Sequence, residues 1–252
     1  MKQANRERAL TVLSPLAVLA LWQLASQAGL IDQRYVPSPY AIAEAGWSLT
    51  LSGELGRHVF ASLRRLAAGF VLGACPGILL GIVMGLNRWV RAAVDPLVSA
   101  LYPIPKIAIL PLLMLVFGLG DASKVAVVAM SVLFLTVIST TTGVMQLDRI
   151  YFDVARNFGT PWPKLFLRVI LPGILPTVFS GLRISLGVSL VVLVGAEFVA
   201  GNSGIGYLIW SSWQTLVIEN MFVGIIVVTV LGVLSTFFLH EIERRLIPWR
   251  YD

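Results

Sequence analysis

The chain has 252 residues, of which 57% are hydrophobic and only 13% are charged, and its mean hydropathy is +0.85. Soluble domains are about 45–50% apolar and about 25% charged, so the composition excludes an ordinary soluble fold. The net charge is +6, yet no basic run exceeds two residues, which argues against a nucleic-acid-binding surface. We therefore interpret the chain as one all-α membrane protein.

Apolar runs long enough to cross a bilayer predict six transmembrane helices. They cover residues 9–31, 66–86, 107–120, 125–147, 169–196 and 221–239. The first is longer than the apolar core of a cleaved signal peptide, so we expect it to remain as a span. The third is short, and we extend it back through Asp95-Pro96 and Pro103-Ile104-Pro105 as a kinked helix.

The distribution of basic residues predicts the orientation. With the amino terminus inside, 12 of the 19 Lys and Arg residues fall in cytoplasmic segments and five in outer ones, so both termini are expected in the cytoplasm. The pair Arg64-Arg65 falls on the outer side. We expect it to snorkel from an interfacial helix over residues 54–65.

Small residues recur along the second span. Spacing of four residues lets helix backbones approach closely in lipid, so we expect a helix-packing stripe, with either a helix of the same chain or a second copy as partner. The stripe consists of Gly69, Gly73, Gly77, Gly81 and Gly85. Cys75, the single cysteine, lies in the same apolar span and is expected to be a packed, inert thiol.

Near the outer end of the fifth span, residues 201–206 are rich in glycine and predict a turn. The following segment, with Trp210 and Trp213, predicts a short interfacial helix that is either a gate or docking surface or a plain aromatic anchor.

The chain shows no sign of catalysis. No glycine is followed by lysine, so the phosphate-binding loop G-x-x-x-x-G-K-[ST] is absent. His58, His240 and Cys75 lack metal-ligand spacing. We expect no catalytic residue, no metal site and no cofactor in this chain, and hence no enzyme.

The segment between the fourth and fifth spans predicts a helix-turn-helix. Apolar residues at helical spacing indicate a short helix over 148–158, Gly159 predicts its end, and Thr160-Pro161 predicts the start of a second short helix. Its apolar face needs either a protein partner or the lipid surface.

The same segment resembles the EAA loop of the permeases of binding-protein-dependent ABC importers, whose pattern is E-A-A-x3-G-x9-I-x-L-P. Here the pattern is met by Asp153-Val154-Ala155, Gly159 and Val169-Ile170-Leu171-Pro172, with conservative departures at 153, 154 and 169. Further matches resemble the taurine, aliphatic sulfonate and nitrate branch of that family. They are Pro37-Ser38-Pro39, Gly181-Leu182-Arg183-Ile184, Gly204-Ile205-Gly206-Tyr207 and Arg244-Arg245-Leu246-Ile247-Pro248-Trp249.

The resemblance implies a type I importer permease (MetI-like) fold in a bacterial inner membrane. It implies two permease copies, most simply a homodimer, around one pathway for a small anion, two cytoplasmic ABC ATPase subunits that carry ATP and Mg²⁺, and an extracytoplasmic binding protein. The residues that would couple to the ATPase are Asp153, Ala155, Phe158, Gly159, Leu171 and Pro172.

We divide the chain into residues 1–65 (first span and outer segment), 66–240 (permease core with the coupling loop 148–172) and 241–252 (cytoplasmic tail). Arg183 and Glu197 are candidate pathway residues, although Arg183 could instead be satisfied by backbone carbonyls at a helix contact. The alternative function is an ion-coupled secondary transporter, against which the scarcity of charges within the spans argues.

Overall fold

The computed structural model describes the backbone of residues 2–250 and the side chains of residues 13–249, and every secondary-structure element in the described residues is a helix. Its helices are α1 (Lys2–Gln27), α2 (Pro39–Leu51), α3 (Glu54–Leu86), α4 (Arg88–Leu101), η1 (Lys106–Ile109), α5 (Leu110–Phe117), α6 (Asp121–Met145), α7 (Arg149–Asn157), α8 (Trp162–Leu165), η2 (Phe166–Ile170), α9 (Leu171–Ala200), α10 (Ile205–Gln214), α11 (Ile218–Leu246) and η3 (Pro248–Arg250).

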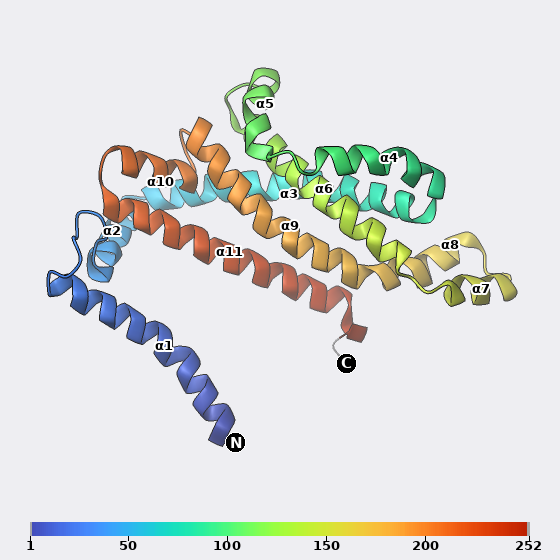
Figure 1. The fold of residues 1–252 in the computed structure, drawn as a ribbon, viewed down its shortest axis with the longest axis horizontal. Helices are drawn as coiled ribbons and strands as arrows, with labels where there is room; N and C mark the ends of the chain where they lie inside the picture. The colour runs from blue at the N-terminus through green and yellow to red at the C-terminus, as the bar shows by residue number, and fades with distance from the viewer. Residues whose placement is uncertain (1, 251–252) are drawn as a thin grey trace.

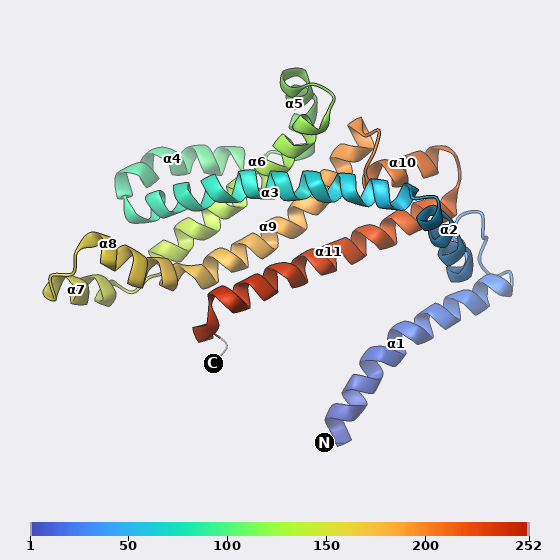
Figure 2. The same cartoon turned by 180° about the vertical axis from the view of Figure 1, so that it is seen from behind.

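The long helices α3, α6, α9 and α11 run along the long axis of the molecule (Figures 1 and 2). Helices α2 and α10 lie at one end, on the left of Figure 1, and α7 and α8 lie at the other. The largest apolar cluster joins α3, α6 and α9 and continues to α7 and α8. Helix α1 diverges from the bundle and contacts mainly α2.

Within the described part of the chain, four helices are long and apolar enough to cross a membrane: α3, α6, α11 and the continuous helix Trp162–Ala200. Helix α4 and the segment Lys106–Phe117 together could form a fifth span, but they meet at 89°. The kinked third span that we expected is therefore a sharply broken one, because Pro103 and Pro105 interrupt the helix. The first predicted span falls in α1, part of which lies outside the residues whose side chains are described.

The glycine stripe of α3 faces α6 of the same chain. A Cβ at Gly73 would lie 2.4 Å from the carbonyl oxygen of Ala129, and one at Gly81 would lie 2.6 Å from Cβ of Thr140. At Gly69, Gly77 and Gly85 a Cβ would lie 2.5 Å from Val128, 2.9 Å from Thr136 and 2.4 Å from Val144, respectively. Both helices use a four-residue repeat, so each glycine meets one side chain of α6 and the backbones approach closely.

Two expectations about α3 are wrong. Residues 54–65 form no separate interfacial helix, because α3 runs unbroken from Glu54 to Leu86, and Arg65 is only 2% exposed rather than snorkelling. Cys75 is exposed rather than packed. It lies between Gly73 and Gly77 in sequence and therefore points away from the face that these glycines press against α6.

Candidate functional site

The predicted coupling helix is α7, and side-chain and backbone hydrogen bonds define both of its ends. The Asp148 carboxylate caps the first turn by accepting a hydrogen bond from the backbone N–H of Ile150 at 3.0 Å. At the other end the Thr160 N–H donates to the Ala155 carbonyl at 2.9 Å and the Gly159 N–H donates to Arg156 at 3.0 Å. This is a Schellman motif, and Gly159 takes the left-handed conformation it requires, with φ of +60°.

The second helix begins one residue later than predicted, at Trp162, with Pro161 as its N-cap. It is also not a separate short helix, since α8 continues through the π-helical turn η2 into α9. Within that turn the Leu171 N–H donates to the Phe166 carbonyl, one residue beyond the α-helical partner. Pro172 has no N–H to donate and its ring crowds the preceding turn, which explains why the helix widens there instead of breaking. One helix of 39 residues thus connects the loop to the far side of the bundle.

Helix α7 has one face in the core and one face outside it. Ala155 is buried with Leu165 and Ile170 in the main apolar cluster, whereas the Phe158 side chain is 84% exposed. Other exposed apolar side chains of α7 and α8 are Ile150, Tyr151, Val154 and Trp162. The inner face fixes the loop to the membrane bundle, and the outer face remains available to a partner.

A hollow of about 610 Å³ lies between α7 and α8. It is lined by Phe152, Asp153, Arg156, Gly159, Thr160, Trp162 and Leu165. Of the predicted coupling residues, Asp153 and Gly159 line this hollow and Phe158 lies exposed beside it, whereas Ala155 is buried and Leu171 and Pro172 are partly buried at the start of α9. The structure therefore separates the predicted set into an outward-facing group and an anchoring group.

A buried polar cluster lies at the opposite end of the bundle, around Glu197. Its carboxylate has no exposed surface and accepts hydrogen bonds from Arg65 Nη1 at 2.7 Å, Ser62 Oγ at 2.9 Å and the Gly206 N–H at 2.9 Å. Arg65 also donates to Asp121 at 2.7 Å and to the Ser203 carbonyl at 2.7 Å. The cluster thereby joins α3, α6 and α9 to the predicted 201–206 turn and to α10, which follows it. The pathway role expected for Glu197 stays a prediction.

The sequence interpretation missed the partners of Glu197. Ser62 accepts a hydrogen bond from the Ile205 N–H at 2.8 Å, and His58 accepts one from the Gly204 N–H at 3.1 Å, so α3 caps the start of α10. The available signal was the occurrence of Arg65 and Glu197 at the ends of apolar runs, because charges in such places need a partner.

Arg183 lies on α9, near the middle of the continuous helix Trp162–Ala200. Its guanidinium forms an ion pair with Glu243 of α11, whose side chain is only 1% exposed, and lies 3.3 Å from His240 Nδ1. We considered Arg183 as a pathway residue or as an arginine satisfied by backbone carbonyls, and neither alternative included an ion pair with a carboxylate. The arginine is 42% exposed and borders a hollow with Thr229, Thr236 and Phe237, so its pathway role stays a prediction.

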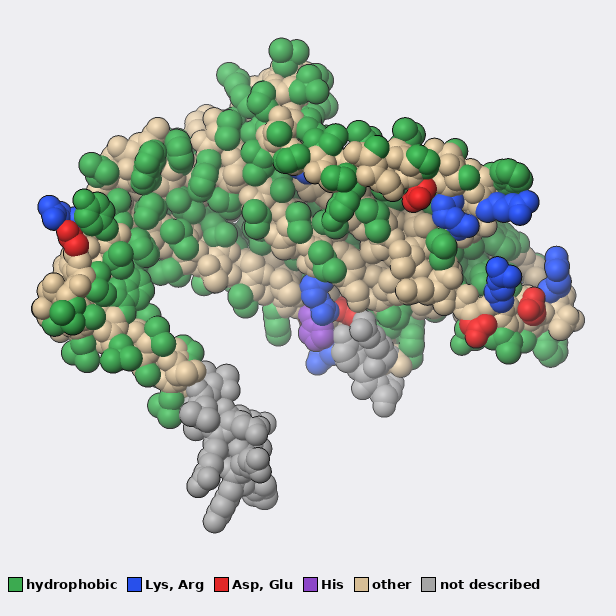
Figure 3. Space-filling model, viewed as in Figure 1, with side chains coloured by type: hydrophobic (Ala, Val, Ile, Leu, Met, Phe, Trp, Pro, Cys, Tyr) green, Lys and Arg blue, Asp and Glu red, His purple; other side chains and the backbone are tan. Residues whose placement is uncertain are grey.

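Within the part of the chain whose side chains are described, no group of three or more His, Cys, Asp or Glu residues could hold a metal ion. On the face drawn in Figure 3, Lys and Arg side chains gather mainly at the end that carries α4 and α7.

A bundle of membrane-spanning helices that ends in a loop with an outward apolar face is typical of a membrane subunit that docks onto a partner protein. Comparison with known proteins makes this specific. Residues 77–248 match the family described as the binding-protein-dependent transport system inner membrane component, and the chain belongs to that family.

Relatives match over nearly the whole chain. A Bacillus subtilis (strain 168) protein whose name assigns it to aliphatic sulfonate transport, SsuC, is 36% identical and the match covers 95% of this chain and 87% of that protein. The taurine transport system permease protein TauC of Escherichia coli (strain K12) is 31% identical, with coverage of 97% and 91%. The nitrate import permease protein NrtB of Synechocystis is 30% identical, with coverage of 92% and 86%.

Among solved structures, an inward-facing structure of the methionine ABC transporter MetNI has a TM-score of 0.54. The match covers 84% of this chain and 98% of that chain at 17% identity, so it supports the fold alone. The expected importer permease fold and the resemblance to the sulfonate, taurine and nitrate branch are confirmed.

Proposed function

We propose that this chain forms, with a second copy of itself, the membrane pathway of an ATP-driven importer for a small anion of the aliphatic sulfonate, taurine or nitrate type. Three relatives that each match over more than nine-tenths of this chain are named for transport of those solutes. All of these solutes carry a compact anionic group. ATP and Mg²⁺ would bind to two separate ATPase subunits, since this chain lacks a phosphate-binding loop.

The exposed face of α7 carries this proposal. Phe158 and its apolar neighbours, beside the hollow that contains Asp153 and Gly159, form a surface that a cleft on the ATPase would cover. Movement of the ATPase would then pass through the 39-residue helix, whose other end is held by the Glu197 cluster. Leu171 and Pro172 belong to this long helix rather than to the surface that would contact the ATPase.

The orientation supports the same assignment. The end of the molecule with α7 carries most of the basic side chains in Figure 3, as the cytoplasmic end of a membrane protein does. We place the tail 241–252 and both termini on that side, and the turn 201–206 with α10 on the outer side, where a binding protein delivers solute. The membrane would be the bacterial inner membrane. Family membership favours this importer over an ion-coupled secondary transporter.

The test is reconstitution in lipid vesicles with the ATPase and the binding protein. We expect uptake of labelled anion that requires both ATP and the binding protein. Phe158→Asp should insert and fold, because the side chain is 84% exposed, but should lose the ATPase, since a charge replaces the central apolar contact. Phe158→Leu is the matched control and should keep it. Uptake driven by an ion gradient without ATP, or full ATPase retention by Phe158→Asp, would contradict the proposal.

A further inference from the structure

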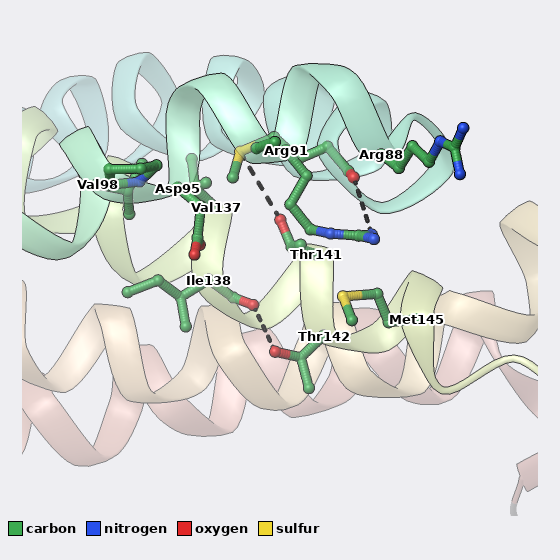
Figure 4. A pocket seen from close by; sticks show the side chains of 12 residues that line it. Arg88, Arg91, Asp95, Val98, Val137, Ile138, Thr141, Thr142 and Met145 are labelled. Atoms are coloured by element: carbon green, nitrogen blue, oxygen red, sulfur yellow. Dashed lines mark hydrogen bonds between the residues drawn. The ribbon is translucent and has the colours of Figure 1, made fainter.

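A polar hollow lies between α4, α6 and the last turn of α3, at the end of the bundle that carries α7 (Figure 1). Its volume is about 490 Å³. Its polar groups come from Arg88, Arg91, Asp95, Thr141 and Thr142, and much of the remaining wall is apolar, including Met84, Val98, Val137, Ile138 and Met145. Figure 4 shows Arg91 and Asp95 extending from α4 toward α6, while Arg88 points away.

Three charged side chains line this hollow, Arg88, Arg91 and Asp95, and the two that extend toward α6, Arg91 and Asp95, do not neutralise each other. Arg91 and Asp95 are one helical turn apart, a spacing that commonly forms an ion pair. Arg91 instead turns to the end of α3, where it makes two long hydrogen bonds of 3.4 Å to the carbonyls of Met84 and Gly85. The Asp95 carboxylate makes no hydrogen bond or ion pair with any group that the structure describes. Some N–H groups of the Arg91 guanidinium and both oxygens of the Asp95 carboxylate are therefore available to a ligand.

The surroundings of these groups restrict what can fill the hollow. Charged side chains are unfavourable against hydrocarbon, and Asp95 is exposed, so we expect water or a polar molecule in this space. The hydroxyls of Thr141 and Thr142 donate to the backbone of Gly81 and Ile138, at 3.3 and 2.9 Å, which leaves their oxygens able to accept. A plain anion would bind Arg91 but would be repelled by Asp95, whereas a molecule with both charges satisfies both side chains.

We propose that this hollow binds a small zwitterion, an aminoalkanesulfonate, with its sulfonate on Arg91 and its ammonium group on Asp95. The Met84, Val137 and Met145 side chains then cover the alkyl segment. The sulfonate identity rests on the proposed function, whereas the need for an amino group rests on Asp95. In the orientation proposed above, the site lies at the cytoplasmic end of the bundle, where the solute would leave the pathway.

Binding of labelled 2-aminoethanesulfonate tests this proposal, with the permease and ATPase complex in lipid nanodiscs without binding protein. We expect saturable binding, and unlabelled ethanesulfonate, which lacks only the amino group, should compete at least about tenfold more weakly than the unlabelled amino compound. Asp95→Asn should abolish this preference and Asp95→Glu should retain it, whereas Arg91→Gln should weaken binding of both compounds. Glu44→Gln removes an exposed carboxylate from α2 at the other end and is the control.

Absence of saturable binding by the unaltered complex, or a preference for the amino compound that survives in Asp95→Asn, would overturn the inference. If a variant fails to assemble with the ATPase, the competition measured on the unaltered complex and on Asp95→Glu still decides. Uptake with ATP and binding protein, measured in parallel, separates the two proposals. If uptake depends on ATP but the complex does not prefer 2-aminoethanesulfonate to ethanesulfonate, only this inference is refuted. If uptake does not depend on ATP, the proposed function is refuted.

Discussion

At the scale of single residues, Gly159 is the position where conformation alone should decide function. Its φ is +60°, and a Cβ built there would have no atom within 4 Å. A side chain would therefore meet no steric clash with a neighbour, and its cost would be backbone strain of about 1–3 kcal/mol for a β-branched residue.

We predict that Gly159→Val inserts and retains the ATPase, but that solute uptake and the stimulation of ATP hydrolysis by the binding protein fall together. The strained turn would redirect α7 relative to α8 without touching a span. Gly159→Asn is the control, because asparagine tolerates the left-handed conformation, and it should stay close to normal. Both activities are measured in reconstituted vesicles. Equal coupling in the Val and Asn variants would refute a role for the turn in transmission.

Glu197 offers a second test at this scale, because a structural role and a pathway role predict different results. Removal of the carboxylate in Glu197→Ala leaves Arg65, which is 2% exposed, with one carboxylate fewer, and breaking a buried pair costs on the order of 3–5 kcal/mol. We predict a large drop in the thermal stability of the solubilised protein. Ser62→Ala, which removes a neutral hydroxyl that donates to Glu197 and accepts from Ile205, should cause a smaller drop. Normal stability with lost transport would instead support the pathway role.

At the scale of helices, the α3–α6 contact depends on the absence of side chains at the glycine stripe. We predict that Gly73→Ala destabilises the protein by about 1–3 kcal/mol, because its Cβ would lie 2.4 Å from the backbone oxygen of Ala129, which cannot move without shifting α6. Gly77→Ala, at 2.9 Å from a side-chain carbon, should cost less.

Gly56 provides the control on the same helix, because no atom lies within 4 Å of the position that a methyl group would take there. Gly56→Ala should be neutral or stabilising by up to about 1 kcal/mol, since alanine favours helix over glycine. Thermal unfolding in detergent measures all three variants. The same loss of stability at Gly56 and Gly73 would show that close approach is not the cause.

At the scale of the whole molecule, the orientation in the membrane can be read with single cysteines. The single cysteines are introduced into a protein that carries Cys75→Ser, because the native thiol is exposed and would react as well. We predict that Asn157→Cys, at the end of α7, reacts with an impermeant thiol reagent only from the cytoplasmic side, and Asn202→Cys only from outside. Asn202 is preferred to its neighbour Ser203, which bonds to Arg65. The opposite labelling pattern would invert the orientation.

Local features of this molecule were predictable from its sequence, and contacts between distant segments were not. The periodicity around Tyr151 and the glycine at 159 indicated α7 and its end because both signals act within one helical turn. Arg65 and Glu197 are 132 residues apart, so no local pattern joins them. Exposure of Cys75 was mispredicted because an apolar neighbourhood does not distinguish a face packed on protein from a face left open.

Proline has two different effects on the helices of this chain, and the sequence alone did not distinguish them. At Pro103 and Pro105 it ends a helix and produces the 89° bend. At Pro172 the chain instead accommodates the ring by widening one turn, and the helix continues to Ala200. The difference depends on whether neighbouring helices hold the segment, and Ile170 and Ile174, both 0% exposed, show that they do here.

The widened turn at Phe166–Ile170 also determines which direction the loop faces around the axis of the long helix. A π-helical turn contains one residue more than an α-helical turn, and each residue advances a helix by about 100°. The face of α8 is therefore rotated by about a quarter-turn from the direction that an uninterrupted α-helix would give it. Deleting one residue from this turn would leave the exposed apolar side chains of α7 unchanged. It would rotate the whole loop about the axis of the long helix, so that these side chains face a different direction.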